Sequence, residues 1–139
     1  MKKILFILLF AIILLGCAFG QETLHYGNGT IAWSDNLIDT DGIPYPELPT
    51  YEIVAYDKNI GITGMFSLGT SINMELDYVL DGYERRVYIC GVRAVYNEKV
   101  SDYIWSNIAD DTLDGVPFGI VPGEKEAFTL IKPKGMGIK

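Results

Sequence analysis

The sequence predicts an all-β fold, a two-layered β-sandwich that follows an N-terminal signal helix, and three observations lead to this prediction. From Gln21 onward apolar residues often recur at every second position. No stretch there keeps the i, i+3, i+4, i+7 spacing of an amphipathic helix over three turns. The alternating runs are short and are separated by Gly, Pro and Asn, as is typical of sandwiches and barrels. With 139 residues the chain suits a single domain.

The first twenty residues have the pattern of a secretory signal peptide. Met1-Lys2-Lys3 gives a positive start, Ile4 to Leu15 is an unbroken apolar run, and small residues follow up to Gly20. The uncharged stretch is shorter than the ~20 apolar residues that a membrane-spanning helix needs. We therefore expect residues 1–20 to direct export and to be removed.

Two cleavage positions fit this segment. Ala18-Phe19-Gly20 satisfies the small-x-small rule and would place the cut before Gln21. Leu14-Leu15-Gly16-Cys17 resembles the lipobox of bacterial lipoproteins, and this resemblance implies a cut before Cys17 and a lipid on its thiol. The expected location is therefore either a lipoprotein tethered to the cell envelope or a secreted or periplasmic protein, and the lipid chains would supply the membrane anchor.

Charge and residue counts exclude several classes of function. The formal net charge of −7 becomes −9 when Lys2 and Lys3 are lost with the signal peptide, so nucleic acid is not an expected partner. A single His and two Cys exclude a disulfide framework and most His/Cys metal sites. His25 is the only His, so a catalytic triad would depend on it, and we expect neither an enzyme nor a cofactor.

The strands are expected in the following order. The first lies within Glu22 to Tyr26, and Thr30 to Trp33 follows an Asn28-Gly29 turn. Tyr51 to Asp57 alternates around Tyr51, Ile53 and Ala55, and Ile62 to Leu68 holds a weaker strand. The intervening segment, Asp35 to Thr50, contains three prolines and is expected to be a loop.

The second half of the chain carries the clearest alternation. In Ser71 to Leu80, one face is expected to collect Ile72, Met74, Leu76, Tyr78 and Leu80. Val87 to Tyr96 is nearly continuous in β-formers, and Tyr103 to Trp105 follows a short polar turn. Read locally, Asp81-Gly82 would join the two long strands as a hairpin.

Several of these residues together resemble a fibronectin type III domain. That family has a Trp on its second strand, where Trp33 stands, and Tyr-x-Val-x-Tyr on its third, where the chain has Tyr51-Glu52-Ile53-Val54-Ala55. Its sixth strand resembles Tyr88 to Asn97, with Ser101 after the turn. The resemblance implies a sandwich over residues 22–108, a crossing between sheets at Asp81-Gly82, and a Tyr88 hydroxyl bonded to upstream backbone.

The same residues leave one alternative fold open and define the expected core. Tyr88-Ile89-Cys90 also resembles the Tyr-x-Cys of immunoglobulin domains, so an immunoglobulin-like sandwich without a disulfide is the second fold. Residues 109–139 are then an extension, in which Phe118 to Val121 and Ala127 to Ile131 flank Pro122-Gly123 either as an extra hairpin or as part of a loosely attached tail. The expected core side chains are Trp33, Tyr51, Ile53, Tyr88, Cys90, Val92 and Ala94.

The expected function is that of a non-catalytic exported interaction or structural module. The resemblance implies recognition of a protein or polysaccharide partner at the cell envelope through loops and strand edges. Tyr45, Tyr103 and Trp105 are the expected ligand contacts, because exposed aromatic side chains often dominate binding energy. The alternative is a small carbohydrate-binding module, which requires Trp105 and at least two Tyr rings to be coplanar on one face.

Overall fold

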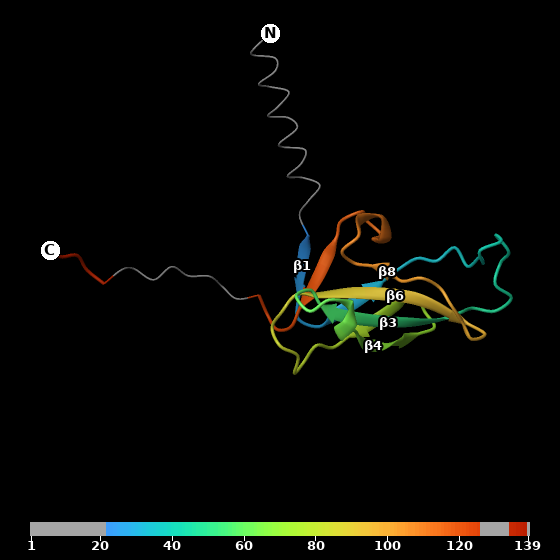
Figure 1. The fold of residues 1–139 in the computed structure, drawn as a ribbon, viewed down its shortest axis with the longest axis horizontal. Coiled ribbons are helices and arrows are strands. Elements are labelled where there is room, and N and C mark those ends of the chain that lie inside the picture. Colours follow the sequence, from blue (N-terminus) through green and yellow to red (C-terminus); the bar gives the residue numbers. More distant parts are fainter. Residues whose placement is uncertain (1–21, 126–133, 139) are drawn as a thin grey trace, which may run out of the picture.

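The chain folds into two facing β-sheets of unequal size (Figure 1). The computed structural model describes residues 22–125 and 134–138. The expected signal segment, Cys17 and the stretch 127–131 lie outside the described residues. Within the described part, the all-β prediction is confirmed, since the only helical elements there are the short 3-10 turns η1 (Ile62–Gly64) and η2 (Ala109–Asp111).

The larger sheet has the strand order β1-β9-β6-β3-β4, with two short strands added to β6. Its elements are β1 (Thr23–Tyr26), β3 (Thr50–Asp57), β4 (Phe66–Ser71), β6 (Tyr88–Tyr96), β7 (Lys99–Val100), β8 (Ile104–Trp105) and β9 (Phe118–Val121). The smaller sheet consists of β2 (Gly29–Ala32) paired antiparallel with β5 (Glu75–Tyr78).

The core lies between the two sheets and follows the period-two alternation of their strands. Along β3, Tyr51, Ile53 and Ala55 are at most 3% exposed, and β6 adds Cys90 and Val92. The smaller sheet and its flanks contribute Ile31, Trp33, Tyr78 and Leu80. Of the expected core residues, Trp33, Tyr51, Ile53, Tyr88, Cys90 and Val92 are buried, whereas Ala94 is only partly buried at the rim.

The connection between β5 and β6 crosses from one sheet to the other, so the crossing at Asp81-Gly82 is confirmed and no hairpin forms there. The Tyr88 hydroxyl donates to the carbonyl oxygen of Glu84 at 2.9 Å, as expected. Burial and the nearby Asp57 and Glu84 carboxylates raise the pKa of Tyr88, so this donor keeps its proton. The bond ties the end of the crossing to the start of β6.

The expected inward position of Ile72 was wrong, and the strand expected within Ile62 to Leu68 covers only part of that stretch. Ile72 is 71% exposed. β4 continues to Ser71, and the Ser71 hydroxyl donates hydrogen bonds to the carbonyl oxygens of Asn73 and Glu75, so the chain bends directly after the strand. The stretch from Ile62 to Leu68 begins with η1, and its strand starts only at Phe66. In both places a local turn displaces the first residues of a predicted strand.

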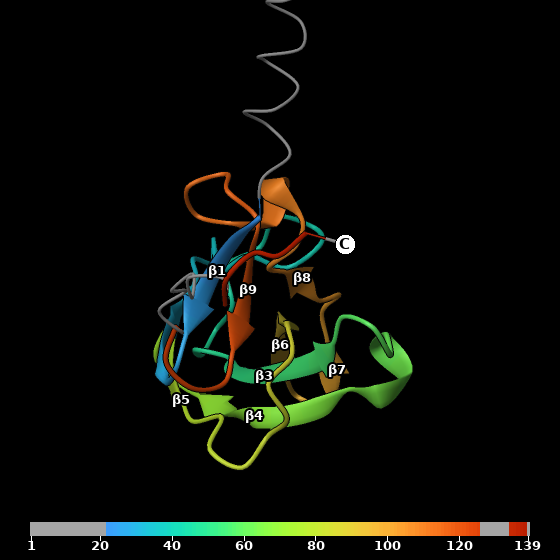
Figure 2. The same cartoon turned by 90° about the vertical axis from the view of Figure 1, so that its left-hand side faces the viewer.

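β9 lies within residues 109–139, the expected extension. β9 belongs to the larger sheet, where it pairs parallel with β1 and antiparallel with β6 through Tyr88 and Ile120 (Figure 2). The sandwich therefore extends at least to Val121. Within the described residues β9 has β1 and β6 as its neighbours, and the other arm of the expected hairpin, residues 127–131, lies outside them.

Candidate binding groove and aromatic face

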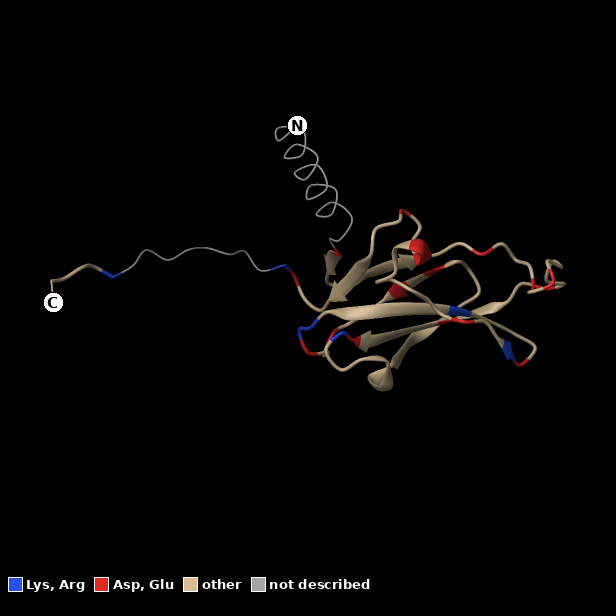
Figure 3. Cartoon of the chain, turned by 45° about the horizontal axis from the view of Figure 1, so that its top comes forward, with Lys and Arg blue, Asp and Glu red and all other residues tan. Residues whose placement is uncertain are grey.

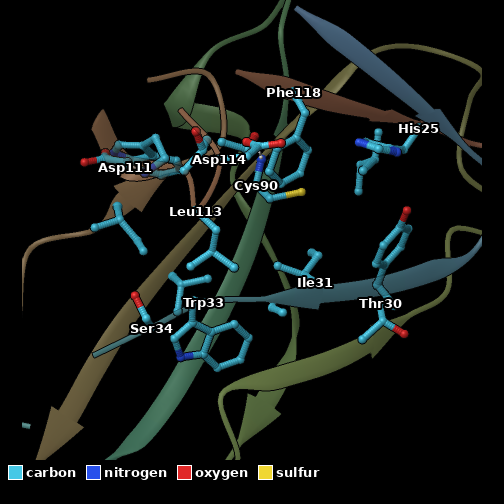
Figure 4. A pocket seen from close by; sticks show the side chains of 18 of the residues that line it. His25, Thr30, Ile31, Trp33, Ser34, Cys90, Asp111, Leu113, Asp114 and Phe118 are labelled. Carbon is cyan, nitrogen blue, oxygen red and sulfur yellow. Dashed lines mark hydrogen bonds between the residues drawn. The ribbon is translucent and has the colours of Figure 1, made fainter. Parts of the chain in front are cut away.

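A groove of about 560 Å³ opens between the two sheets (Figure 4). Ile31 of β2 and the adjacent Trp33 lie on one side, and Phe118 of β9 lies on the other side beyond Cys90. His25 and Leu113 lie at its borders. Its lining combines apolar side chains from β2, β6 and β9 with polar side chains from the segment between β8 and β9, so it favours an amphipathic occupant over a free ion.

One wall of the groove is formed by residues 107–117, which connect β8 to β9 and leave the sheet between them; this segment is called the excursion below. β8 pairs with β6 at Gly91 and Val92, and β9 pairs with it at Tyr88. Ser106 bridges the break, since its hydroxyl accepts from the Cys90 amide at 3.0 Å and its carbonyl accepts from the Phe118 amide at 2.7 Å. The chain between them is therefore free to leave the sheet.

The excursion is acidic and is fastened to the sheet by one of its own carboxylates. Asp111 Oδ2 accepts from the Trp105 amide at 2.8 Å. Asp110 and Asp114 line the same wall, and Figure 3 shows the acidic colour of η2 on the excursion. Three carboxylates beside an apolar interior would attract an occupant that carries basic residues next to apolar ones.

The opposite wall is a strand edge that has no partner among the described residues. β2 pairs only with β5, because β1 pairs with β9. The Trp33 amide donates to the Met74 carbonyl at 3.1 Å, so Trp33 and, by alternation, Ile31 and Gly29 bond toward β5. The backbone groups of Thr30, Ala32 and Ser34 therefore face away from β5, along the groove that these residues line.

The groove interior lacks an activated nucleophile. Burial raises the pKa of the Cys90 thiol to about 12, which leaves it protonated and unreactive near neutral pH. Burial also raises the pKa of Tyr78. His25 packs edge-on against the Phe118 ring at a centroid distance of 5.5 Å. The described residues contain no group of three His, Cys, Asp or Glu side chains that could hold a metal ion.

A second surface covers the outer face of the larger sheet. The Trp105 indole lies directly on the backbone of Gly91, where an added Cβ would come within 2.4 Å of the ring. The Tyr56 ring contacts it at 5.3 Å and 72°, and Tyr103 contacts it at 5.0 Å and 36°. The Arg93 guanidinium carbon lies 4.8 Å from the centre of the Tyr103 ring, and Arg93 Nε donates a hydrogen bond to the Glu52 carboxylate.

This aromatic face is not a flat platform. The angles of 36° and 72° mean that Trp105 and its two Tyr neighbours are not coplanar, and the Arg93 guanidinium covers part of Tyr103. The geometry required for the carbohydrate-binding alternative is therefore not formed here.

The structure brings together two of the three expected contact residues. Tyr103 and Trp105 are adjacent and half-buried, whereas Tyr45 stacks on Tyr96 at 5.7 Å. The groove was missed by sequence reasoning, because it depends on which strand β1 joins. The signal that could have pointed to it is the acidic stretch Asp110 to Asp114, whose aspartates line the groove.

Comparisons of the chain with protein-family models, with curated proteins and with solved structures found no match. Among the described residues, none of the helices has the length and apolar character needed to cross a membrane.

Proposed function

We propose that the chain is an exported, non-catalytic interaction module with a fibronectin type III-like sandwich, which binds a protein partner at the cell envelope. The groove between β2 and the 107–117 excursion is the observation that carries this proposal. It combines an apolar interior, an acidic wall and an unpaired strand edge, and these three features together suit an extended polypeptide segment.

The fibronectin type III-like assignment is supported by the crossing at Asp81-Gly82, by the Tyr88–Glu84 bond and by the burial of Trp33 against Tyr51. Export is supported by the signal-like first twenty residues. Lipidation of Cys17 would place the module at a membrane surface, and cleavage before Gln21 would release it. The mass of the mature protein distinguishes the two.

A protein partner is favoured over a polysaccharide because the rings around Trp105 are tilted against one another. Sugar rings bind by stacking on flat aromatic surfaces, whereas a strand edge bonds any extended peptide through its backbone. The groove offers the second kind of contact.

The test compares two exposed apolar residues of the described loops. Leu113 lines the groove and is 66% exposed, and Ile62 in η1 is 54% exposed and does not line it. When the chain is used as bait in an envelope extract, the wild type and Ile62→Asp should both retain one specific protein. Leu113→Asp should no longer retain it. Capture that both variants preserve, or that neither wild type nor variants achieve, would contradict the proposal.

A further inference from the structure

We propose that the groove of one copy binds residues 127–131 of a second copy, so that the chain assembles with itself by strand donation. This inference rests on the proposed function and names the partner of the groove. It is built from an unpaired strand edge, an apolar cavity beside it and a segment with a matching sequence.

The edge of β2 determines what an incoming strand would do. A strand that pairs with the outward backbone groups of Thr30 and Ala32 would place every second side chain toward the core, beside Ile31 and Trp33. Those side chains would enter the cavity of about 560 Å³. The occupant therefore needs two bulky apolar residues spaced two apart, with a polar residue between them that faces solvent.

The stretch Ala127-Phe128-Thr129-Leu130-Ile131 has this pattern. Phe128 and Leu130 share one face of an extended chain, and Thr129 lies on the other. All but Ala127 and Leu130 are strong β-formers. Lys132 and Lys134 follow at once, so the segment carries positive charge where the groove wall carries Asp110, Asp111 and Asp114.

The fold of one copy leaves no place for this segment beside β9, because β1 and β6 already flank that strand. The described residues 134–138, which follow the segment, are all exposed, and Met136 and Ile138 are each 104% exposed. A second copy is the occupant that these observations favour, since every copy carries both the groove and the segment.

Sedimentation velocity of the chain from Gln21 to Lys139, from micromolar to millimolar concentration, tests the proposal. The wild type should associate as its concentration rises. Phe128→Asp should weaken association by about tenfold or more, because the aspartate would enter an apolar cavity. Ile138→Asp, a matched change at an exposed apolar residue outside the segment, should leave association unchanged.

Ala32→Pro tests the acceptor edge. It removes an amide that faces away from β5, so β2 can still pair with β5. Near-ultraviolet circular dichroism checks that this variant is folded, and Asp110→Lys provides a second acceptor variant at an exposed side chain. Both acceptor variants should associate more weakly than the wild type.

A mixture gives the sharpest result. Phe128→Asp keeps an open groove, and Ala32→Pro keeps an intact segment, so the two variants together should form one-to-one pairs and nothing larger. A wild type that stays monomeric at every concentration, or folded variants that fail to pair, would overturn the proposal. If the monomeric protein still captured an envelope protein in a Leu113-dependent way, the proposed function would stand and self-assembly alone would fail.

Discussion

The two layers of this sandwich differ in how far their strands are paired. In the larger sheet, β6 and β3 have neighbours on both sides, and Ile53 and Ala55 are fully buried. In the smaller sheet, β2 has one neighbour among the described strands, and the groove lies along its other edge. The difference arises because β1 joins β9 rather than β2. The larger sheet therefore has the more completely paired strands, and the smaller sheet has the open edge on which the proposed binding depends.

The largest effect is expected in the centre of the larger sheet. Ile53→Ala should lower the free energy of unfolding by about 2–5 kcal/mol, because a fully buried side chain leaves a cavity. Denaturant titration measures this loss. The control is Ile72→Ala, which should change stability by no more than about 0.5 kcal/mol, since Ile72 is mostly exposed. Equal losses at both sites would contradict the described core.

The outer face of the same sheet should respond next. Gly91→Ala places a methyl group inside the contact distance of the Trp105 ring and should cost about 1–3 kcal/mol through overpacking. Tryptophan fluorescence should shift as the indole moves into water. Gly137→Ala, at a site with open space around it, should leave both readouts unchanged. An unchanged emission spectrum in the first variant would show that Trp105 does not rest on Gly91.

The hydrogen bond that ties the crossing segment to β6 should have a smaller effect. Tyr88→Phe removes the hydroxyl that donates to the Glu84 carbonyl and should cost about 0.5–1.5 kcal/mol. The control is Tyr83→Phe at a 43% exposed ring, which should be near neutral. Chemical denaturation of the two variants separates a structural hydroxyl from an exposed one.

Alkaline pH should destabilise the fold through Cys90, the buried thiol that lines the groove. The Cys90 pKa rises from 9.0 to about 12 on folding, so above pH 9 the unfolded thiol loses its proton while the folded one keeps it. The free energy of unfolding should therefore fall as pH rises from about 9 to about 12. Cys90→Ala should make this fall shallower but not remove it, because the pKa of the Tyr51 hydroxyl is also raised, chiefly by burial and then by its bond to Asp35. An unchanged slope in Cys90→Ala would contradict a buried thiol.

Much of the larger sheet could be predicted because its signal is local. The alternation of Tyr51, Ile53 and Ala55 along one strand, and of Tyr88, Cys90 and Val92 along another, identifies which side chains face the core. The position of β9 could not be predicted in this way. Its sequence, Phe118 to Val121, resembles a hairpin arm, and only its parallel pairing with β1, far away in the chain, places it in the sheet.

The candidate site was harder to predict because it depends on which strands pair with one another. Trp33 was expected in the core and is buried there, yet it also lines the groove, which exists because β2 has no second neighbour among the described strands. Trp105 was expected as a ligand contact, but its half-buried position depends on the absence of a side chain at Gly91. A sequence pattern indicates which face of a strand is apolar and does not indicate which edge stays unpaired.

Amide hydrogen exchange in β2, at a concentration where the chain is monomeric, tests the unpaired edge most directly. The Trp33 amide, bonded to the Met74 carbonyl, should be protected, and the Ala32 amide, which faces the groove, should exchange at close to the rate of an unfolded chain. Raising the concentration should then protect Ala32 if copies donate strands to one another. Equal protection of Ala32 and Trp33 in the dilute monomer would mean that the edge is already paired, and the account of the groove would be wrong.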